Sequence, residues 1–164
     1  MGTEGLLLLN EKGKGHPYTR DEVETYLNAR SQSDIDSLVG LTCWDVVLFF
    51  CYNDDKDMPE DTYKKRTAIV FPGIDNKKDF VKIITTTSTY ETYQYWKQPI
   101  IKWKEAGFTQ QVWFNENDFK DHVLKNTPFT GTSKHFLIKK VGVLQDTDRT
   151  TIKGLYDYYK NGGV

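Results

Sequence analysis

The chain has 164 residues and a mass of 19.1 kDa, with 38% hydrophobic and 27% charged residues and a formal net charge of −1. These values are ordinary for one soluble globular domain, and they exclude a coiled coil, a collagen and a wholly disordered chain. The apolar run at residues 6–9 is too short for a signal peptide or a membrane span and is typical of a short strand. We therefore expect a cytoplasmic protein with no membrane partner.

A loop with Gly13, Gly15 and Pro17 follows the predicted strand, and from Thr19 the sequence predicts one or two small helices, with Thr19 and Glu22 at the spacing of a capping box. Apolar residues then repeat at helical spacing as far as Arg30, and a second short turn ends at Gly40. Together with the strand at residues 6–9, these helices form the predicted N-terminal extension, residues 1–43.

The next segments predict a set of strands joined by short turns. Trp44–Tyr52 is a continuous run of β-branched and aromatic residues, which is typical of a central strand. An acidic loop follows at residues 53–61. Arg66–Phe71 and Phe80–Thr87 predict two further strands, with a turn between them. Strands that follow one another so closely favour an antiparallel barrel or a half-open roll.

The second half of the chain mixes strand and helix signals. Ile100–Trp103 and Val112–Asn115 predict short strands, and Asn117–Asn126 predicts a helix. His135–Val141 predicts another strand, and Asp148–Lys160 has the apolar spacing of a terminal amphipathic helix. The predicted fold class is thus mostly β with flanking helices (α+β).

Charges are distributed unevenly along the chain. Residues 1–63 contain five Lys or Arg against thirteen Asp or Glu, whereas residues 64–104 contain nine against three. A local excess of positive charge attracts a polyanion even when the whole chain is near neutral. The middle third therefore predicts a phosphate-binding face, with a solvated lysine-rich surface as the alternative.

Metal and cofactor signals are weak. Cys43 and Cys51 lie roughly 26 Å apart if both belong to one extended strand, which forbids a disulfide between them. The three histidines are scattered, and the sequence contains no CxxC, no HExxH, no GxSxG and no phosphate-binding glycine loop. We expect neither a metal nor a cofactor.

The order of several segments resembles the PemK/MazF-like toxin endoribonucleases of toxin–antitoxin pairs. The resemblance covers roughly residues 44–160, about 70% of the chain, and makes this sequence a divergent member. The matching segments are WDVVLFF at 44–50, KKRTAIVF at 64–71, VKIITTTSTY at 81–90, IIKWKEAGF at 100–108, QQVWF at 110–114 and LIKKVGVLQDTD at 137–148.

The resemblance implies a small SH3-like antiparallel barrel over residues 44–164, preceded by the extension. It also implies a homodimer that cuts single-stranded RNA without a metal and has a cognate antitoxin as a possible partner. Trp96, Trp103 and Trp113 are candidates for the dimer contact or for stacking on unpaired bases.

The resemblance also implies a cleavage centre. The catalytic arginine falls on Arg66 and the catalytic threonine on Thr87, with Thr85 on the same strand face. Arginine neutralises charge on the phosphorane that forms when the 2′-hydroxyl attacks the phosphate. Glu60 and Asp61, just before Arg66, are the candidate general bases. Four further residues are candidate RNA-binding residues: Lys64, Lys65, Lys82 and Trp103.

Two positions depart from the family pattern, because Thr67 replaces the usual proline and Val112 replaces the expected serine. These departures keep open a catalytically inactive PemK/MazF-like module that binds nucleic acid or a protein partner, such as a mobile-element or phage regulatory or inhibitor protein. A third hypothesis is an inhibitor that uses the acidic loop at residues 53–61 for surface mimicry.

Overall fold

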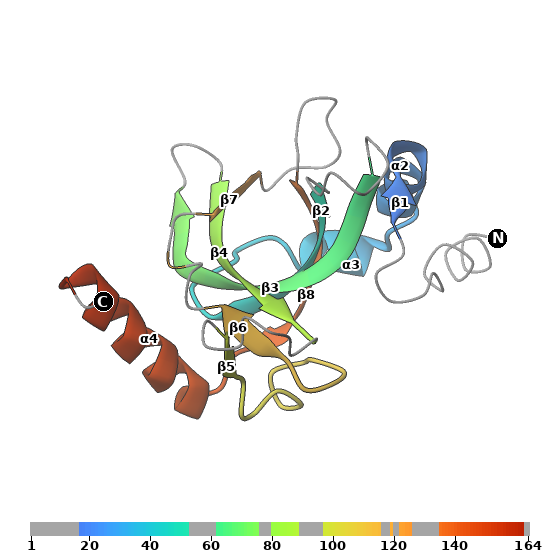
Figure 1. The fold of residues 1–164 in the computed structure, drawn as a ribbon. Coiled ribbons are helices and arrows are strands. Elements are labelled where there is room, and N and C mark those ends of the chain that lie inside the picture. Colours follow the sequence, from blue (N-terminus) through green and yellow to red (C-terminus); the bar gives the residue numbers. More distant parts are fainter. Residues whose placement is uncertain are drawn as a thin grey trace.

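The computed structural model describes residues 17–52, 62–75, 80–88, 97–115, 119, 122–125 and 135–162. These residues form a mostly antiparallel β-sheet with a few helices, an α+β fold (Figure 1). The elements are β1 (Tyr18–Thr19), α2 (Arg20–Asn28), α3 (Gln32–Asp36), β2 (Asp45–Tyr52), β3 (Thr62–Asp75), β4 (Phe80–Thr87), β5 (Lys97–Pro99), β6 (Trp113–Asn115), β7 (His122–Lys125), β8 (His135–Val143) and α4 (Asp146–Lys160).

Strand order in the described sheet is β1-β3-β2-β8-β7-β4-β6-β5, and β3 pairs with β4 as well as with β2. The pairings between described strands are antiparallel apart from β7 with β8, which pair in parallel at Lys125 and Phe136. The long strand β3 curves through the sheet and carries β1 and α2 at one end (Figure 1). β2 is central, as predicted, with β3 on one side and β8 on the other.

The bounds of β4 confirm the predicted strand Phe80–Thr87. β2 begins one residue later than predicted, because Trp44 has a φ of +81° and leaves the extended region. Two backbone hydrogen bonds hold Trp44 there: its N–H donates to the Val70 carbonyl (2.7 Å), and its carbonyl accepts from Leu144 N–H (2.8 Å). β3 also continues past the predicted turn, to Asp75.

The helix predicted over Asn117–Asn126 is wrong at its C-terminal end. His122–Lys125 is strand β7, which pairs antiparallel with residues 80–83 of β4. Sheet pairing decides the conformation here, because the hydrogen-bonding edge of β4 is available to a segment with weak local helix preference.

The strand predicted at Ile100–Trp103 is also wrong, since residues 101–107 form a turn. The carboxylate of Asp148, in the first turn of α4, accepts hydrogen bonds from the backbone N–H groups of Ile101 (2.8 Å) and Lys102 (2.9 Å). Those two donors are therefore satisfied by a side chain rather than by a neighbouring strand.

Buried residues form three clusters on the two faces of the sheet. The central cluster contains Leu41, Val47, Phe49, Ala68, Val70, Val81, Ile83 and Leu137. The α4 cluster includes Val46, Ile69, Phe71, Ile84, Phe108, Phe114 and Ile152. The α2 cluster contains Tyr18, Val23, Tyr26, Leu27, Phe50, Tyr63, Phe136 and Ile138. Strand alternation separates the central cluster from the other two, so that Val46 and Val47 enter different clusters.

Helix α2 confirms the predicted capping box: Thr19 Oγ accepts from Glu22 N–H, and the Glu22 carboxylate accepts from Thr19 N–H. Its buried residues pack against the sheet in the α2 cluster. Just after it, the half-buried Arg30 side chain donates to the carbonyls of Leu137 (3.1 Å) and Ile138 (3.2 Å) on β8. The part of the extension that the structure describes is thus docked on the sheet. In the described chain, no helix is both long and apolar enough to cross a bilayer.

Candidate functional site on strands β3 and β4

Among the predicted site residues, Arg66 is the cation whose position best suits binding of a phosphate. It lies in β3 directly opposite Phe49 of β2, and opposed residues of antiparallel strands share a face. Phe49 belongs to the central cluster, so Arg66 is on that face of the sheet. Its side chain is half-buried, and no ion pair or hydrogen bond joins it to another residue in the described part of the chain.

Lys64 lies on the same face of β3, two residues before Arg66 and opposite Cys51 of β2. It is half-buried as well, and no described residue forms an ion pair with it. The structure therefore brings together two of the predicted cations, and their charges are not neutralised by a described carboxylate. Such a pair suits a ligand with negatively charged oxygens.

The three threonines at the end of β4 are divided between the two faces. Thr85 lies opposite Ala68 of β3, at the last paired position in this direction. The next position is joined through side chains, because Thr67 Oγ and Thr86 Oγ lie 2.6 Å apart. Extended by two residues beyond the pair of Ala68 with Thr85, this register would set Arg66 opposite Thr87. Arg66, Thr85 and Thr87 thus share the central-cluster face.

Thr86 is on the other face, as the sequence predicted for it. It is 4% exposed, and its hydroxyl donates to the Thr67 carbonyl (3.1 Å) as well as contacting the Thr67 hydroxyl. Thr67, which stands where the resembling family has proline, therefore ties β3 to β4 next to the candidate site. A proline would supply no hydroxyl for this contact.

The other predicted RNA-binding residues are not gathered around Arg66. Lys65 lies on the opposite face of β3, where its Nζ is 5.5 Å from the centroid of the Tyr26 ring. Lys82 alternates with the central-cluster residues of β4 and is on the opposite face as well. Trp103 packs against the α4 cluster. Charge and residue type grouped these three with Arg66, but strand alternation and the fold separate them from it.

The candidate bases, Glu60 and Asp61, lie outside the described residues. Their place relative to Arg66 stays a prediction of the sequence, as does any contact of Lys65, Lys82 or Trp103 with RNA.

Trp113 is the residue that the topology adds to this region. It belongs to β6 and lies directly opposite Thr87 of β4. Its sequence neighbours, Val112 and Phe114, are buried in the α4 cluster, so Trp113 is on the opposite face from them. The sequence named Trp113, with Trp96 and Trp103, as a candidate for the dimer contact or for base stacking. The β4–β6 register is what connects it with Thr87.

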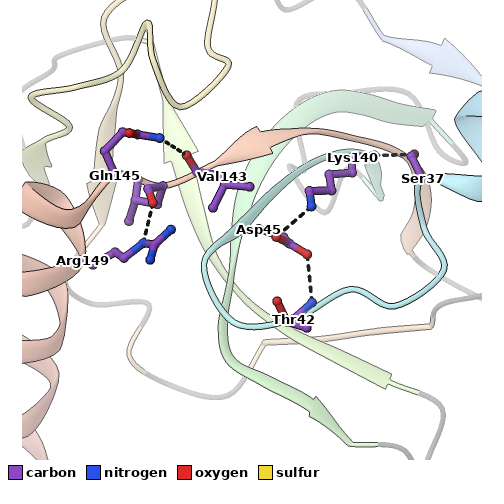
Figure 2. Close-up of polar contacts among 8 residues, drawn as sticks. Ser37, Thr42, Asp45, Lys140, Val143, Gln145 and Arg149 are labelled. Carbon is purple, nitrogen blue, oxygen red and sulfur yellow. Dashed lines mark hydrogen bonds and ion pairs between the residues drawn. The ribbon is translucent and has the colours of Figure 1, made fainter.

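A second polar cluster lies at the start of β2 and is shown in Figure 2. Asp45 is 4% exposed; its carboxylate lies 3.1 Å from the Nζ of Lys140 and accepts from Thr42 N–H at 2.9 Å. The backbone N–H of Lys140 donates to Ser37 Oγ (2.9 Å). The carboxylate is engaged by groups that hold the segment after α3 against β8. We therefore assign this cluster a structural role rather than a role in binding or catalysis.

Near the start of α4, Arg149 and Gln145 donate to the backbone carbonyls of Leu144 and Val143, which fixes the end of β8 (Figure 2). Among the described residues, no three His, Cys, Asp or Glu side chains are grouped as metal ligands would be. In comparisons with known proteins, the sequence matches no protein-family model and no curated protein.

Proposed function

We propose that this protein is a toxin endoribonuclease that cleaves single-stranded RNA without a metal ion. The observation that carries the proposal is the position of Arg66, a half-buried cation with no ion-pair partner among the described residues, in register with Thr87 on the neighbouring strand. A cation and a hydroxyl on adjacent strands, with a second cation at Lys64, provide what a phosphodiester needs: charge neutralisation and a fixed orientation.

In the proposed reaction, the ribose 2′-hydroxyl attacks the adjacent phosphorus in line. A new O2′–P bond forms and the P–O5′ bond breaks; the leaving oxygen takes a proton from solvent, which gives a 2′,3′-cyclic phosphate and a free 5′-hydroxyl. Arg66 contacts two non-bridging oxygens and offsets the negative charge that grows on them, and Thr87 donates a hydrogen bond to the same phosphate. Glu60 or Asp61 accepts the 2′-hydroxyl proton. DNA lacks the attacking group and is not cut.

The proposal includes the small SH3-like barrel over residues 44–164, the homodimer and the antitoxin partner that the resemblance implies. Support for the barrel comes from the pairings of β3 with both β2 and β4 and of β8 with both β2 and β7. The pairing of β3 with β4 supports the resemblance. The matched segments at residues 64–71 and 81–90 lie on these neighbouring strands, and they contain Arg66 and Thr87, the two residues of the expected cleavage centre.

Binding of RNA without cleavage is the second candidate. The pair formed by Lys64 and Arg66 accounts for phosphate binding alone, and Thr67 fixes the adjoining strands through Thr86 where the resembling family has proline. A protein of this second kind binds single-stranded RNA through the same face and leaves it intact.

The deciding experiment incubates the purified protein with single-stranded RNA in excess chelator, beside the Arg66→Ala and Arg66→Lys variants. Cleavage that yields 2′,3′-cyclic phosphate ends, and that falls by about 100-fold or more in Arg66→Ala, supports the enzyme. Arg66→Lys keeps the charge but loses the planar fork, so we expect only partial activity. A folded wild-type protein that binds RNA and cuts none overturns the enzyme proposal in favour of the binding module.

A further inference from the structure

Four residues on adjacent strands form a row across the candidate site. Thr87 of β4 is paired with Trp113 of β6, and Trp113 is paired in turn with Pro99 of β5. When the β3–β4 register is extended past Thr67 and Thr86, Arg66 of β3 comes before Thr87 in this row. Residues directly opposite one another in antiparallel strands share a face, so the row lies on the face that carries Arg66. Two strand spacings, roughly 10 Å, separate the backbones at Arg66 and Trp113.

Trp113 differs in its placement from the other tryptophans whose surroundings the structure describes. Trp44 and Trp103 both pack against the α4 cluster. All three are half-buried, but Trp113, which stands in the sequence between the buried Val112 and Phe114 of that cluster, is on the opposite face. Its indole therefore belongs to the face of the sheet that carries Arg66 and Thr87.

We propose that Trp113 is a stacking platform for the base next to the phosphate that Arg66 holds. This inference rests on the proposed function, because it takes the Arg66–Thr87 pair as the phosphate site. A nucleotide that places its phosphate between Arg66 and Thr87 extends its base either toward β2 or toward β6. On the β2 side the opposing residue is Phe49, which is 1% exposed. The β6 side offers the indole of Trp113.

A stacking platform at Trp113 favours single-stranded RNA over a duplex. A base that is paired and stacked in a duplex has no free π-face, whereas an unpaired base can lie against an aromatic side chain. Stacking of this kind tolerates every base, so Trp113 selects unpaired RNA without reading its sequence. Trp113 is then a binding and positioning residue, and Arg66 and Thr87 remain the residues at the phosphate.

The test measures binding separately from cleavage. Labelled single-stranded 2′-deoxy oligonucleotides, which lack the attacking hydroxyl, are titrated with wild-type protein and with the Trp113→Ala and Trp113→Phe variants. Loss of one stacked base corresponds to an increase in Kd of about 5- to 150-fold for Trp113→Ala. Trp113→Phe keeps an aromatic face and retains most of the affinity. Trp44→Phe is the matched control, because Trp44 packs against the α4 cluster and is not among the candidate RNA-binding residues.

An abasic position moved along the oligonucleotide identifies the stacked base. At one position, removal of the base weakens binding to the wild-type protein. The same removal has no further effect on binding to Trp113→Ala, because the indole that stacks on this base is already absent. Equal Kd values for wild type and a folded Trp113→Ala overturn the inference, as does a wild-type protein that does not bind single strands. Binding that depends on Trp113 in a protein that cuts no RNA upholds the inference and overturns only the enzyme proposal.

Discussion

Gly107 and Gly142 pack backbone against backbone, and this contact joins the 101–107 turn to the end of β8. A Cβ atom on Gly142 would lie 1.9 Å from the carbonyl oxygen of Ala106, and one on Gly107 would lie 2.3 Å from that of Val141. Gly107 also has a φ of +103°, a conformation that glycine adopts far more readily than other residues. Two segments that the sequence could only match separately to the resembling family are therefore in direct contact.

Substitution of either glycine by alanine should destabilise the fold. A methyl group at Gly142 meets backbone atoms that cannot rotate away, so we expect Gly142→Ala to lower the free energy of unfolding by about 1–3 kcal/mol or more. Urea unfolding followed by circular dichroism measures the change. Gly154→Ala is the matched control: a methyl group there would meet no packed neighbour within 4 Å, and alanine in helix α4 should add about 0.5–1 kcal/mol. Equal stabilities for the two variants would contradict the close packing.

Asp148 should contribute to stability through its two backbone hydrogen bonds. It is 1% exposed, and Asp148→Ala leaves the N–H groups of Ile101 and Lys102 without their acceptor. We expect a loss of about 1–3 kcal/mol in the free energy of unfolding, since two hydrogen bonds to a charged acceptor are lost. Asp146→Ala, in the same helical turn but exposed, should change stability by about 0.5 kcal/mol or less. If both variants unfold at the same urea concentration, the carboxylate of Asp148 does not hold the turn.

The threonines of β4 should separate activity from stability. Thr87→Ala removes the proposed hydrogen bond to the phosphate, so cleavage should fall by about 10-fold or more with little change in urea midpoint. Thr86→Val removes the buried hydroxyl that bonds to Thr67; it should lower stability by about 1 kcal/mol and leave cleavage by the folded protein unchanged. Thr85 lies on the same face of β4, two residues before Thr87. Thr85→Ala should therefore reduce cleavage less than Thr87→Ala does. The reverse pattern, with Thr86 rather than Thr87 controlling cleavage, would exclude the proposed geometry.

Cys43 should react slowly with alkylating agents in the folded protein. Burial raises the pKa of the Cys43 thiol above its ordinary value, although the positive charge of Arg149 acts in the opposite direction. At a given pH the folded protein therefore holds less Cys43 thiolate than the unfolded chain, and the thiolate is the reactive form. Because ionisation is easier in the unfolded state, stability should also fall as the pH rises through the ordinary thiol range. Mass spectrometry of iodoacetamide-treated protein, with and without urea, distinguishes Cys43 from Cys51. Equal rates at Cys43 in the two states would show that burial does not suppress its ionisation.

Local signals in the sequence were sufficient for elements whose stability is set within one segment. The capping box at Thr19 and Glu22, the strand Phe80–Thr87 and the terminal helix are specified by short-range hydrogen bonds and by apolar spacing, and the structure confirms them. The alternation rule also separated Thr86 correctly from Thr85 and Thr87, because successive side chains of a strand point to opposite faces whatever the strand pairs with.

Pairing between segments distant in the sequence decided strand β7, the 101–107 turn and the arrangement of the candidate site. Residues 122–125 form a strand because β4 offers them an edge, and residues 101–107 form a turn because Asp148, 47 positions after Ile101, takes their first donors. Register is likewise a tertiary property. It sets Thr85 opposite Ala68 and Trp113 opposite Thr87, and strand alternation places Lys65 and Lys82 on the other face from Arg66 and Thr87. The sequence by itself identified the cations and hydroxyls that we propose for a phosphate site. Only the sheet decided which of them share a face, because a side chain's neighbours across a strand are set by hydrogen bonds to segments that the local pattern does not contain.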